Sequence, residues 1–332
     1  MLNKLISSIG VARQTALGTV ATTPTWVSPL VGSGAVAGVE PSVSIDEETG
    51  QSYAINAYLE EISSSFDTPV RAYPKTLGEF LYGLFGAVVT TAATTTGFYK
   101  HVFSVDATSQ TTPWYTLWGN IESEYVRSSD AKVGAIEISW DGNKPLEAAI
   151  TFACIGVLFG SEAARPTGGT DMAGLNYFTP AGLTFKFAPA GSTLVETKLT
   201  KFGLKLTRNV NPEYFSGSAL PGDLSMGKFE AAPSFTLKPD DLSAFRTAIT
   251  GSATGTAVAE SVVTGAYEVN LTVGSNTLKI SGPKVPFKIS WPDSDASGGA
   301  VELEVSADNQ LGTSSVSPIT IELTNDVASY TA

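Results

Sequence analysis

Ala135-Ile136-Glu137-Ile138-Ser139-Trp140 and Pro286-Phe287-Lys288-Ile289-Ser290-Trp291 are the two stretches of this chain that decide its fold. Each reads as a strand that ends in Ile-Ser-Trp and runs into a turn of Asp, Gly, Asn, Pro or Ser residues. A second alternating segment follows each turn. The recurrence of one strand–turn–strand unit at two distant places predicts that a β domain is duplicated within the chain.

The similarity extends upstream of both hairpins in the same order. A long polar excursion comes first, then a strand that ends in Ser-Phe, and then a helix. In the first and second copy these segments are the excursions 43–59 and 204–229, the strand ends Ser65-Phe66 and Ser234-Phe235, and the helices 77–85 and 241–249. The repeats therefore span 24–155 and 176–324, which is the length of two small domains.

Composition agrees with two β-rich domains. The chain has 332 residues, of which 42% are hydrophobic and only 16% charged, so it can build two cores but lacks the charge content of helical proteins. We expect a mainly β fold with two tandem β-sandwich or partial-barrel domains, each with one short helix. The expected divisions are an N-terminal arm at 1–23, a first domain at 24–155, a linker at 156–176 and a second domain at 177–332.

The spacing of apolar residues predicts which face of each helix meets its sheet. Leu77, Phe80, Leu81, Leu84 and Phe85 recur at helical intervals after Pro74. In the second repeat Leu242, Phe245 and Ile249 follow the break and N-cap supplied by 239–241. Both helices should therefore bury one face.

Several classes of function are disfavoured by the composition. No stretch has the roughly 20 apolar residues of a membrane span, and the first ten residues lack the apolar core of a secretory signal. A single cysteine fits a reducing cytoplasm. A net charge of −12 argues against tight binding to nucleic acid, which needs Lys and Arg at the phosphates. We expect no cofactor and no membrane partner.

Catalytic chemistry finds little support. His101, the one histidine, lies in an aromatic strand with no nucleophile motif beside it, and Cys154 is flanked by apolar residues, as a buried thiol would be. The chain is therefore interpreted as a non-enzyme. Four tryptophans raise the question of a carbohydrate platform, but two end equivalent strands, which favours the core; they are Trp114, Trp118, Trp140 and Trp291.

Two loop motifs have weak functional interpretations. Asp293, Asp295 and Glu304 reproduce part of a calcium loop, yet a strand pattern follows where an EF-hand needs a helix, so a plain turn is preferred and calcium is the weaker alternative. Residues 32–38 contain three glycines without the spacing of a phosphate loop, which favours a flexible connection.

The sequence resembles the tail tube proteins, also called major tail proteins, of long-tailed bacteriophages. The residues that carry the resemblance are the opening stretch 10–19 and Thr23-Pro24-Thr25-Trp26, followed by a strand, a long hairpin, a single helix and closing strands. Proteins of that family form rings whose sheets join into an inner barrel, and the rings stack into a hollow tube that conducts the genome.

The resemblance implies a virion protein of the tail, assembled in the host cytoplasm, whose partners are copies of itself, a tape-measure protein and tail terminator or tip proteins. DNA would pass without sticking. Candidates for lining the lumen are the acidic residues of the first excursion, and candidates for contacts between rings lie on the N-terminal arm 1–23 and on the hairpin tips. The lumen candidates are Asp46, Glu47, Glu48, Glu60, Glu61 and Asp67; the contact candidates are Leu2, Leu5, Ile6, Gly50, Gln51, Pro212 and Tyr214.

Because the family usually has one domain per chain in a six-membered ring, two domains per chain favour a trimeric ring with pseudo-sixfold symmetry. A hexamer whose second domain decorates the outside is the alternative. A different class of function, a secreted carbohydrate- or surface-binding β-sandwich module, also remains open at this point.

Overall fold

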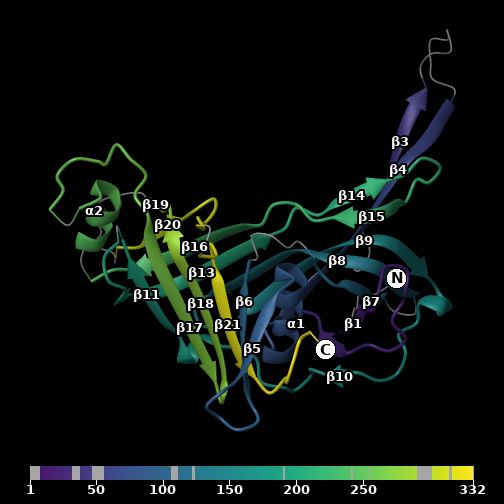
Figure 1. The fold of residues 1–332 in the computed structure, drawn as a ribbon, viewed down its shortest axis with the longest axis horizontal. Helices are drawn as coiled ribbons and strands as arrows, with labels where there is room; N and C mark the ends of the chain where they lie inside the picture. Colours follow the sequence, from purple (N-terminus) through teal and green to yellow (C-terminus); the bar gives the residue numbers. More distant parts are fainter. Residues whose placement is uncertain are drawn as a thin grey trace.

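A computed structural model describes residues 8–31, 38–46, 56–105, 111–121, 124–189, 191–240, 242–252, 254–289, 301–313 and 316–331. The chain is mainly β, as expected, and has two α-helices among these residues (Figure 1). The helices are α1 (Pro74–Phe85) and α2 (Ser243–Thr250), with 3-10 turns η1 (Ser161–Ala163) and η2 (Pro180–Gly182).

The strands of the first part of the chain are β1 (Ser8–Gln14), β2 (Trp26–Pro29), β3 (Gly38–Asp46), β4 (Asn56–Arg71), β5 (Val88–Ala92), β6 (Tyr99–Ser104), β7 (Trp114–Ile121), β8 (Glu124–Asp141), β9 (Glu147–Phe159) and β10 (Thr170–Asp171). Those of the second part are β11 (Thr184–Ala188), β12 (Val195–Glu196), β13 (Lys198–Thr207), β14 (Asn211–Tyr214), β15 (Pro221–Ser225), β16 (Glu230–Lys238), β17 (Gly265–Val273), β18 (Asn276–Val285), β19 (Lys288–Ile289), β20 (Leu303–Ser306) and β21 (Thr320–Asn325).

The larger sheet runs through both halves of the chain without a break. Its strands are adjacent in the order β3, β4, β9, β8, β13, β16, β20 and β19, and every neighbouring pair is antiparallel. The N-terminal part of β8 also pairs with β7, which continues through β1 and β2 to the short parallel strand β10. Among the described strands, this sheet stays open rather than closing into a barrel.

A second sheet lies in front of the first in the view of Figure 1, and α1 lies between them, in contact with β8 of one and with β6 and β21 of the other. Its order is β12, β11, β17, β18, β21, β6 and β5. The strand β6 from the first half of the chain pairs with β21 near the C-terminus, so this sheet also joins the two halves. One continuous hydrophobic core results, with Phe66, Ile138, Leu204, Ile280 and Leu323 among its fully buried members.

The two halves meet along β8 and β13. Seven residue pairs from Lys201↔Asp141 to Thr207↔Ala135 are in register. On the core side Leu204 lies opposite Ile138, and the rings of Trp140 and Phe202 stack with centroids 4.6 Å apart. Because these side chains are buried, this joint has the packing of a domain interior.

The helices follow the sequence pattern. Leu77, Phe80, Leu81, Leu84 and Phe85 are all buried, as predicted, and α1 ends at Gly86 in the left-handed conformation with φ of 73°. In α2 only Phe245 is fully buried. The longer burial of α1 arises because it contacts β8 on one side and β6 and β21 on the other.

Two sequence boundaries differ from the structure. The strand predicted to end at Ser65-Phe66 continues to Arg71, because its second half pairs with β9. The expected linker 156–176 is partly regular: β9 extends to Phe159, and β10 pairs with β2. The described part of the chain contains no helix long and apolar enough to span a membrane.

Replacement of Phe202 by alanine should test the weight of the β8–β13 joint. Loss of a large ring from a fully packed site costs about 3–5 kcal/mol in core substitutions, so we expect the free energy of unfolding to fall by that amount. Lys205→Ala on the same strand is the control, because its side chain is exposed and surface changes stay within about 0.5 kcal/mol. Equal losses of unfolding free energy from the two changes in urea would contradict the view that Phe202 packs in a core shared by both halves.

Candidate assembly surfaces

The face of the large sheet that points away from the core carries only small and charged side chains over a broad area. Side chains alternate along each strand, so the neighbours of the buried residues project to this side. We call it the open face. Its described residues include Ser65, Asp67, Ala135, Glu137, Ser139, Ala149, Thr151, Gly203, Lys205, Ala232, Ser234, Thr236, Glu304 and Ser306.

Acidic and basic residues are interspersed on the open face. Across the β8–β13 joint Lys205 stands opposite Glu137, and Lys201 stands opposite Asp141. Nearby, Arg71 Nη1 lies 2.8 Å from Glu147 Oε1. The face is therefore of mixed charge rather than uniformly acidic. Of the predicted lumen residues, Asp67 is on this face, opposite Thr151 of β9.

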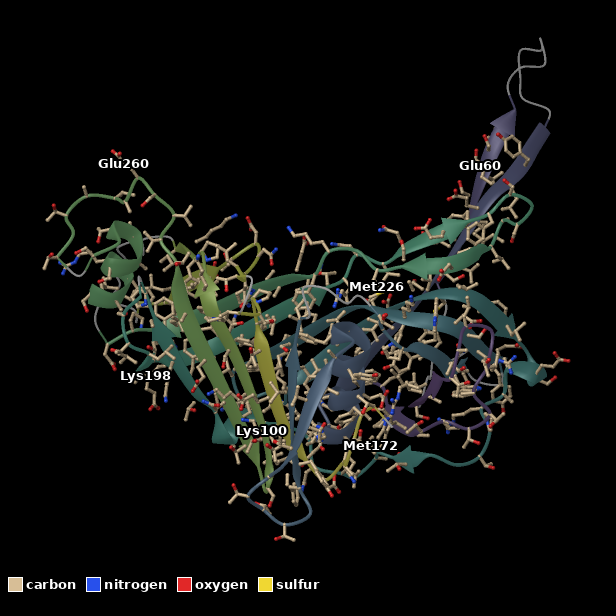
Figure 2. All side chains as sticks on the ribbon, viewed as in Figure 1. Glu60, Lys100, Met172, Lys198, Met226 and Glu260 are labelled. Carbon is tan, nitrogen blue, oxygen red and sulfur yellow. The ribbon has the colours of Figure 1, made fainter. Side chains whose placement is uncertain are left out.

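The remaining described lumen candidates lie on a hairpin that projects from the body. We call β3 together with the N-terminal half of β4, up to Ser65, the arm; it is distinct from the N-terminal segment 1–23. It is seen at the upper right of Figures 1 and 2, and Glu60 is labelled in Figure 2. Glu60 and Glu61 are exposed there, and Ser42 Oγ donates a hydrogen bond to Glu60 Oε2 at 3.2 Å.

Several predicted positions lie outside the described residues. Glu47, Glu48, Gly50 and Gln51 fall between β3 and β4, and Leu2, Leu5 and Ile6 precede β1. Asp46 is the last residue of β3, and its side chain is not described. The structure thus separates the acidic candidates that it describes between the arm and the open face.

The predicted contact residues Pro212 and Tyr214 belong to a smaller hairpin, β14–β15, that lies against the base of the arm. Ile62 N donates to Ala219 O at 2.7 Å, and Tyr214 Oη donates to Ile62 O at 3.3 Å. Partial burial, with the nearby charge of Glu61, raises the pKa of Tyr214. Leu224 of β15 is buried and lies opposite Pro212. This hairpin joins the second half of the chain to the arm of the first.

The exposed side of the second sheet carries an ion-pair ladder. Lys279 Nζ lies 2.7 Å from Glu268 Oε2, Lys186 Nζ lies 3.9 Å from Glu268 Oε1, and Lys100 Nζ lies 2.6 Å from Glu322 Oε2. Burial acts to raise the pKa of Glu268, but hydrogen bonds from Lys279 and Asn270 and the charges of Lys279 and Lys186 hold it below its usual range. This outer side is therefore charge-compensated.

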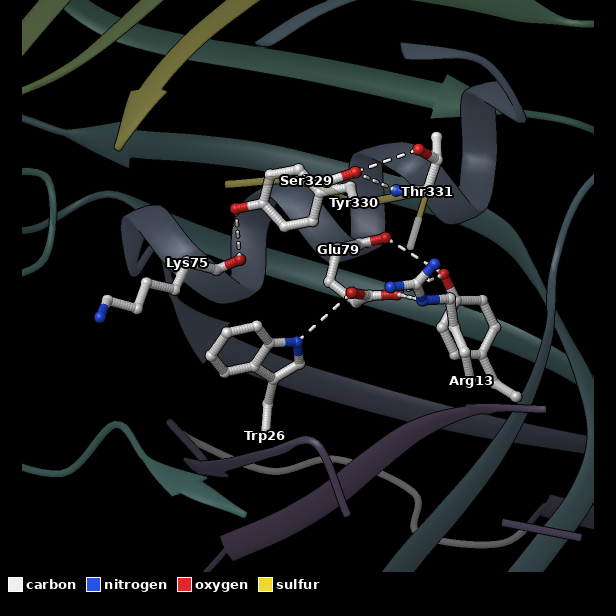
Figure 3. Close-up of polar contacts among 8 residues, drawn as sticks. Arg13, Trp26, Lys75, Glu79, Ser329, Tyr330 and Thr331 are labelled. Atoms are coloured by element: carbon white, nitrogen blue, oxygen red, sulfur yellow. Dashed lines mark hydrogen bonds and ion pairs between the residues drawn. The ribbon is translucent and has the colours of Figure 1, made fainter. Parts of the chain in front are cut away.

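The opening motif of the sequence folds around a buried carboxylate of α1 (Figure 3). Glu79 Oε1 lies 2.8 Å from Arg13 Nε, and Glu79 Oε2 accepts a hydrogen bond from Trp26 Nε1 at 3.4 Å. Tyr115 Oη donates to Glu79 Oε1 at 3.2 Å. Burial raises the pKa of Glu79, whereas Arg13 acts to lower it. Arg13 and Trp26 thus serve to anchor the N-terminal strands to the helix.

The C-terminal segment of the chain holds the N-terminal end of the same helix. The ring of Tyr330 is fully buried, and its hydroxyl donates to Lys75 O at 2.9 Å (Figure 3). Asp326 pairs with Lys75 at 2.8 Å. The ring fits because residue 78 is glycine: a Cβ there would come within 2.3 Å of it. Both ends of the described chain therefore converge on α1.

A buried arginine links the halves at the C-terminus of α1. Arg208 follows β13, and its guanidinium donates to Leu84 O at 3.1 Å and to Phe85 O at 3.2 Å. These are carbonyls that the helix itself leaves without partners. Neither Glu79 nor Arg208 was predicted from the sequence. For Glu79, the presence of a charged residue among the apolar residues of the helix could have indicated a buried ion pair.

The candidate chemical residues occupy structural positions. His101 is buried in β6, where its Nδ1 lies 2.9 Å from Thr90 Oγ1 and its Nε2 lies 3.2 Å from Asn325 Oδ1. Cys154 is buried, which raises the pKa of its thiol to about 12, as expected for a small core residue. Trp118 and Trp140 are also buried, whereas Trp114 is half-buried and Trp291 lies outside the described residues.

The calcium alternative gains no support from the described residues. Glu304 is in the middle of β20, and Asp293 and Asp295 lie outside the described ranges. No group of three acidic, histidine or cysteine side chains suited to a metal is present in the part of the chain that the structure describes.

The described residues thus combine a mainly β chain, an open sheet face of small and charged residues, a projecting arm and one helix held by polar contacts. The sequence model of the phage tail tube protein family matches residues 5–311, nearly the whole chain. The chain belongs to this family, which confirms the resemblance of the opening motif. A comparison with curated proteins returned no match.

Replacement of Glu79 by alanine should destabilise the fold strongly. It removes the carboxylate that pairs with the Arg13 guanidinium and accepts from Trp26, while Tyr115 keeps only the backbone carbonyl of residue 79. Breaking a buried pair costs about 3–5 kcal/mol, less where one partner is partly exposed, as Arg13 is. We expect a loss of about 2–3 kcal/mol in urea unfolding. Glu137→Ala on the open face is the control; an equally small effect of both changes would contradict the anchoring role.

Acid should weaken the fold through His101. Burial lowers the pKa of His101, so the imidazole stays neutral in the folded chain while the unfolded chain takes up a proton below its ordinary pKa of about 6.5. Stability is then full above that pH and declines as the pH falls, by at most about 1.4 kcal/mol per pH unit for one proton.

The measurement is the difference in unfolding free energy between wild type and His101→Gln from pH 7.5 to 5.5. His101 is the one histidine of the chain, and Glu79, whose pKa is raised, would contribute with the opposite sign in both proteins. A difference that does not change with pH would show that His101 titrates normally.

Proposed function

We propose that this protein forms stacked rings that make the hollow tube of a phage tail, through which the genome passes. Membership of the tail tube family supports this role. The observation that carries it is the open face, which continues across both halves of the chain with small side chains and interspersed acidic and basic ones. Such a surface offers DNA neither an apolar platform nor a block of cations without acidic neighbours.

A duplicated domain is part of the proposal. In the large sheet the first half supplies β3, β4, β9 and β8, and the second half supplies β13, β16, β20 and β19. The two sets correspond strand by strand: β3 and β13 begin each set, β4 and β16 precede the helices, β9 and β20 are the last strands, and β8 and β19 precede those last strands in the sequence. The β7–β8 and β17–β18 hairpins, which lead into these last strands, are also alike, since β1 pairs with β7 as β11 pairs with β17.

The helices support the same equivalence at the level of residues. Pro74, Leu77, Phe80 and Gly86 of the first copy are each separated by the same interval from Pro239, Leu242, Phe245 and Gly251 of the second. Gly86 and Gly251 both end their helices in the left-handed conformation, with φ of 73° and 76°. This register matches Phe235 with Val70 rather than with Phe66, and both residues lie across from the equivalent strands β20 and β9.

A ring follows if the joint within the chain is repeated between chains. The β8–β13 contact joins the first copy to the second. One edge of the sheet is β19 and the other is formed by β3 and β4. Because strand directions alternate from one edge to the other, β19 of one chain can pair with the β3–β4 edge of the next chain in antiparallel fashion. Closing a ring of three chains would remove these edges and give pseudo-sixfold symmetry.

The other predicted partners are also part of the proposal. A tube of fixed length requires proteins that end it, so tape-measure, terminator and tip proteins are expected to meet the end rings. The acidic residues of the arm and open face, Glu60, Glu61 and Asp67 among the described ones, are proposed to face the lumen. Localisation in the virion tail follows from the family, and assembly in the host cytoplasm is part of the proposal.

Purified chain examined by negative-stain electron microscopy and native mass spectrometry tests this function. We expect hollow rings or tubes, and a ring mass of three times the chain mass of 34.6 kDa. A ring of six times that mass would support the hexamer with an outer second domain instead. The proposal would be overturned if the chain stayed monomeric both when purified and in an extract of host cells that assemble the tail.

A further inference from the structure

We propose that the segment 251–264, which follows α2, adds as a strand to the C-terminal part of β9 in the neighbouring chain of the same ring. This contact rests on the proposed function, to which it adds a second joint between ring neighbours beside the pairing of β19 with the β3–β4 edge. It is supported by an unpaired apolar edge on β9, by exposed valines in 251–264 and by a contact of the same topology inside the chain.

The receiving edge is the last part of β9. Up to Cys154, β9 pairs with β4 on one side and with β8 on the other. From 155 to 159 it pairs with β8 alone among the described strands, because β4 leaves the sheet there to form the arm. An unpaired edge presents backbone N–H and C=O groups that can bind a strand of another chain.

The side chains at this edge are apolar. Residues 152–159 read Phe-Ala-Cys-Ile-Gly-Val-Leu-Phe, without one polar side chain. Such an unbroken apolar run is typical of a strand that is buried on both faces. Leu158 and Phe159 are instead 44% and 61% exposed. The single chain therefore leaves open an edge whose composition favours burial.

The other half of the chain contains a covered edge of the same topology. In the proposed duplication β20 and β21 together correspond to the single long strand β9, and β21 pairs with β18 as the last part of β9 pairs with β8. On its other side β21 pairs with β6, from Thr320↔Ser104 to Asn325↔Tyr99. Because β6 belongs to the β5–β6 hairpin that follows α1, an element after the helix of one copy covers the edge of the next copy.

Repetition of this contact between chains identifies the occupant. The segment 251–264 follows α2 as the β5–β6 hairpin follows α1, and it leads directly into β17. Val258 and Val262 of this segment are 73% and 76% exposed. β-Branched side chains favour strands, and residues four apart in an extended segment project to the same side. The segment can therefore supply one strand with an apolar side to the open edge of β9.

The two partners lie at opposite ends of the molecule. In Figure 1, α2 and the loop after it are at the left end of the longest axis, whereas β9 lies toward the right; Glu260 of the loop is labelled at the upper left of Figure 2. β19 contacts α2 and so lies at the left end as well. A neighbour that pairs its β3–β4 edge with β19 would thus bring its own β9 to the segment 251–264.

Cysteines introduced at Val262 and Leu158 test this contact. The variant Val262→Cys with Leu158→Cys is treated with a short, flexible bis-maleimide, which joins thiols that lie close together. The control is Val89→Cys with Leu158→Cys; Val89 is 64% exposed on β5, which lies between the two ends in Figure 1. The native Cys154 should not react, because it is buried and its pKa is raised to about 12. Both variants should keep the thermal unfolding temperature of the unaltered chain, because the altered sites are exposed.

Covalent products are then resolved by denaturing electrophoresis and mass spectrometry. We expect the test variant to give covalent dimers and trimers at a yield at least about tenfold above that of the control, because docked thiols meet at a high effective concentration. Equal yields from the two variants, or no covalent multimers in material that electron microscopy shows as rings, would overturn the contact. A link within one chain would overturn it as well. If the unaltered chain made no rings, the proposed function would fail instead.

Discussion

Pairing of β8 with β13 is the contact on which the rest of the molecule depends. It turns two sets of strands into one sheet, and it places Trp140 on Phe202 and Leu204 against Ile138 in a shared core. The same joint keeps the open face continuous, because the strands on either side are in register. If the halves were separate domains on a linker, neither the common core nor the unbroken open face would exist.

The second determinant is α1, which both ends of the described chain hold in place. Arg13 and Trp26 bind its Glu79 carboxylate, Tyr330 binds its first carbonyls through the slot left by Gly78, and Arg208 binds its last ones. Buried charges are costly unless each is paired, and here each has a charged or carbonyl partner. The opening motif that carries the resemblance thus has a packing role here, because Arg13 and Trp26 anchor β1 and β2 to the helix.

The parts of the fold that sequence could predict are those with a local signal. Helical spacing at Leu77, Phe80 and Leu84 located α1, and the alternating pattern before Trp140 located the end of β8. The continuation of β4 to Arg71 was missed because Ser, Asp, Thr and Pro residues interrupt its pattern, and its pairing with β9 is a distant contact. Arg208 and Glu79 were missed for the same reason: their partners lie far away in the chain.

The site was predicted less completely than the fold. Acidic residues clustered along the sequence around the first hairpin; alternation puts Glu61 and Asp67 on the same side of β4, but Glu61 lies on the projecting arm and Asp67 lies on the open face. The mixed charge of the open face came from β8 and β13 together, whose pairing no local pattern reveals. Sequence could name the elements of the site, whereas the register decides which residues share a surface.

Whether the open face lines the channel can be seen in a cryo-electron microscopy map of the assembled tube at side-chain resolution. We expect Ala149, Gly203 and Ser234 to face the channel and the ladder of Lys279 and Glu268 to face outward. A map in which the second sheet lines the channel, or in which the open face is buried against another chain, would contradict this expectation.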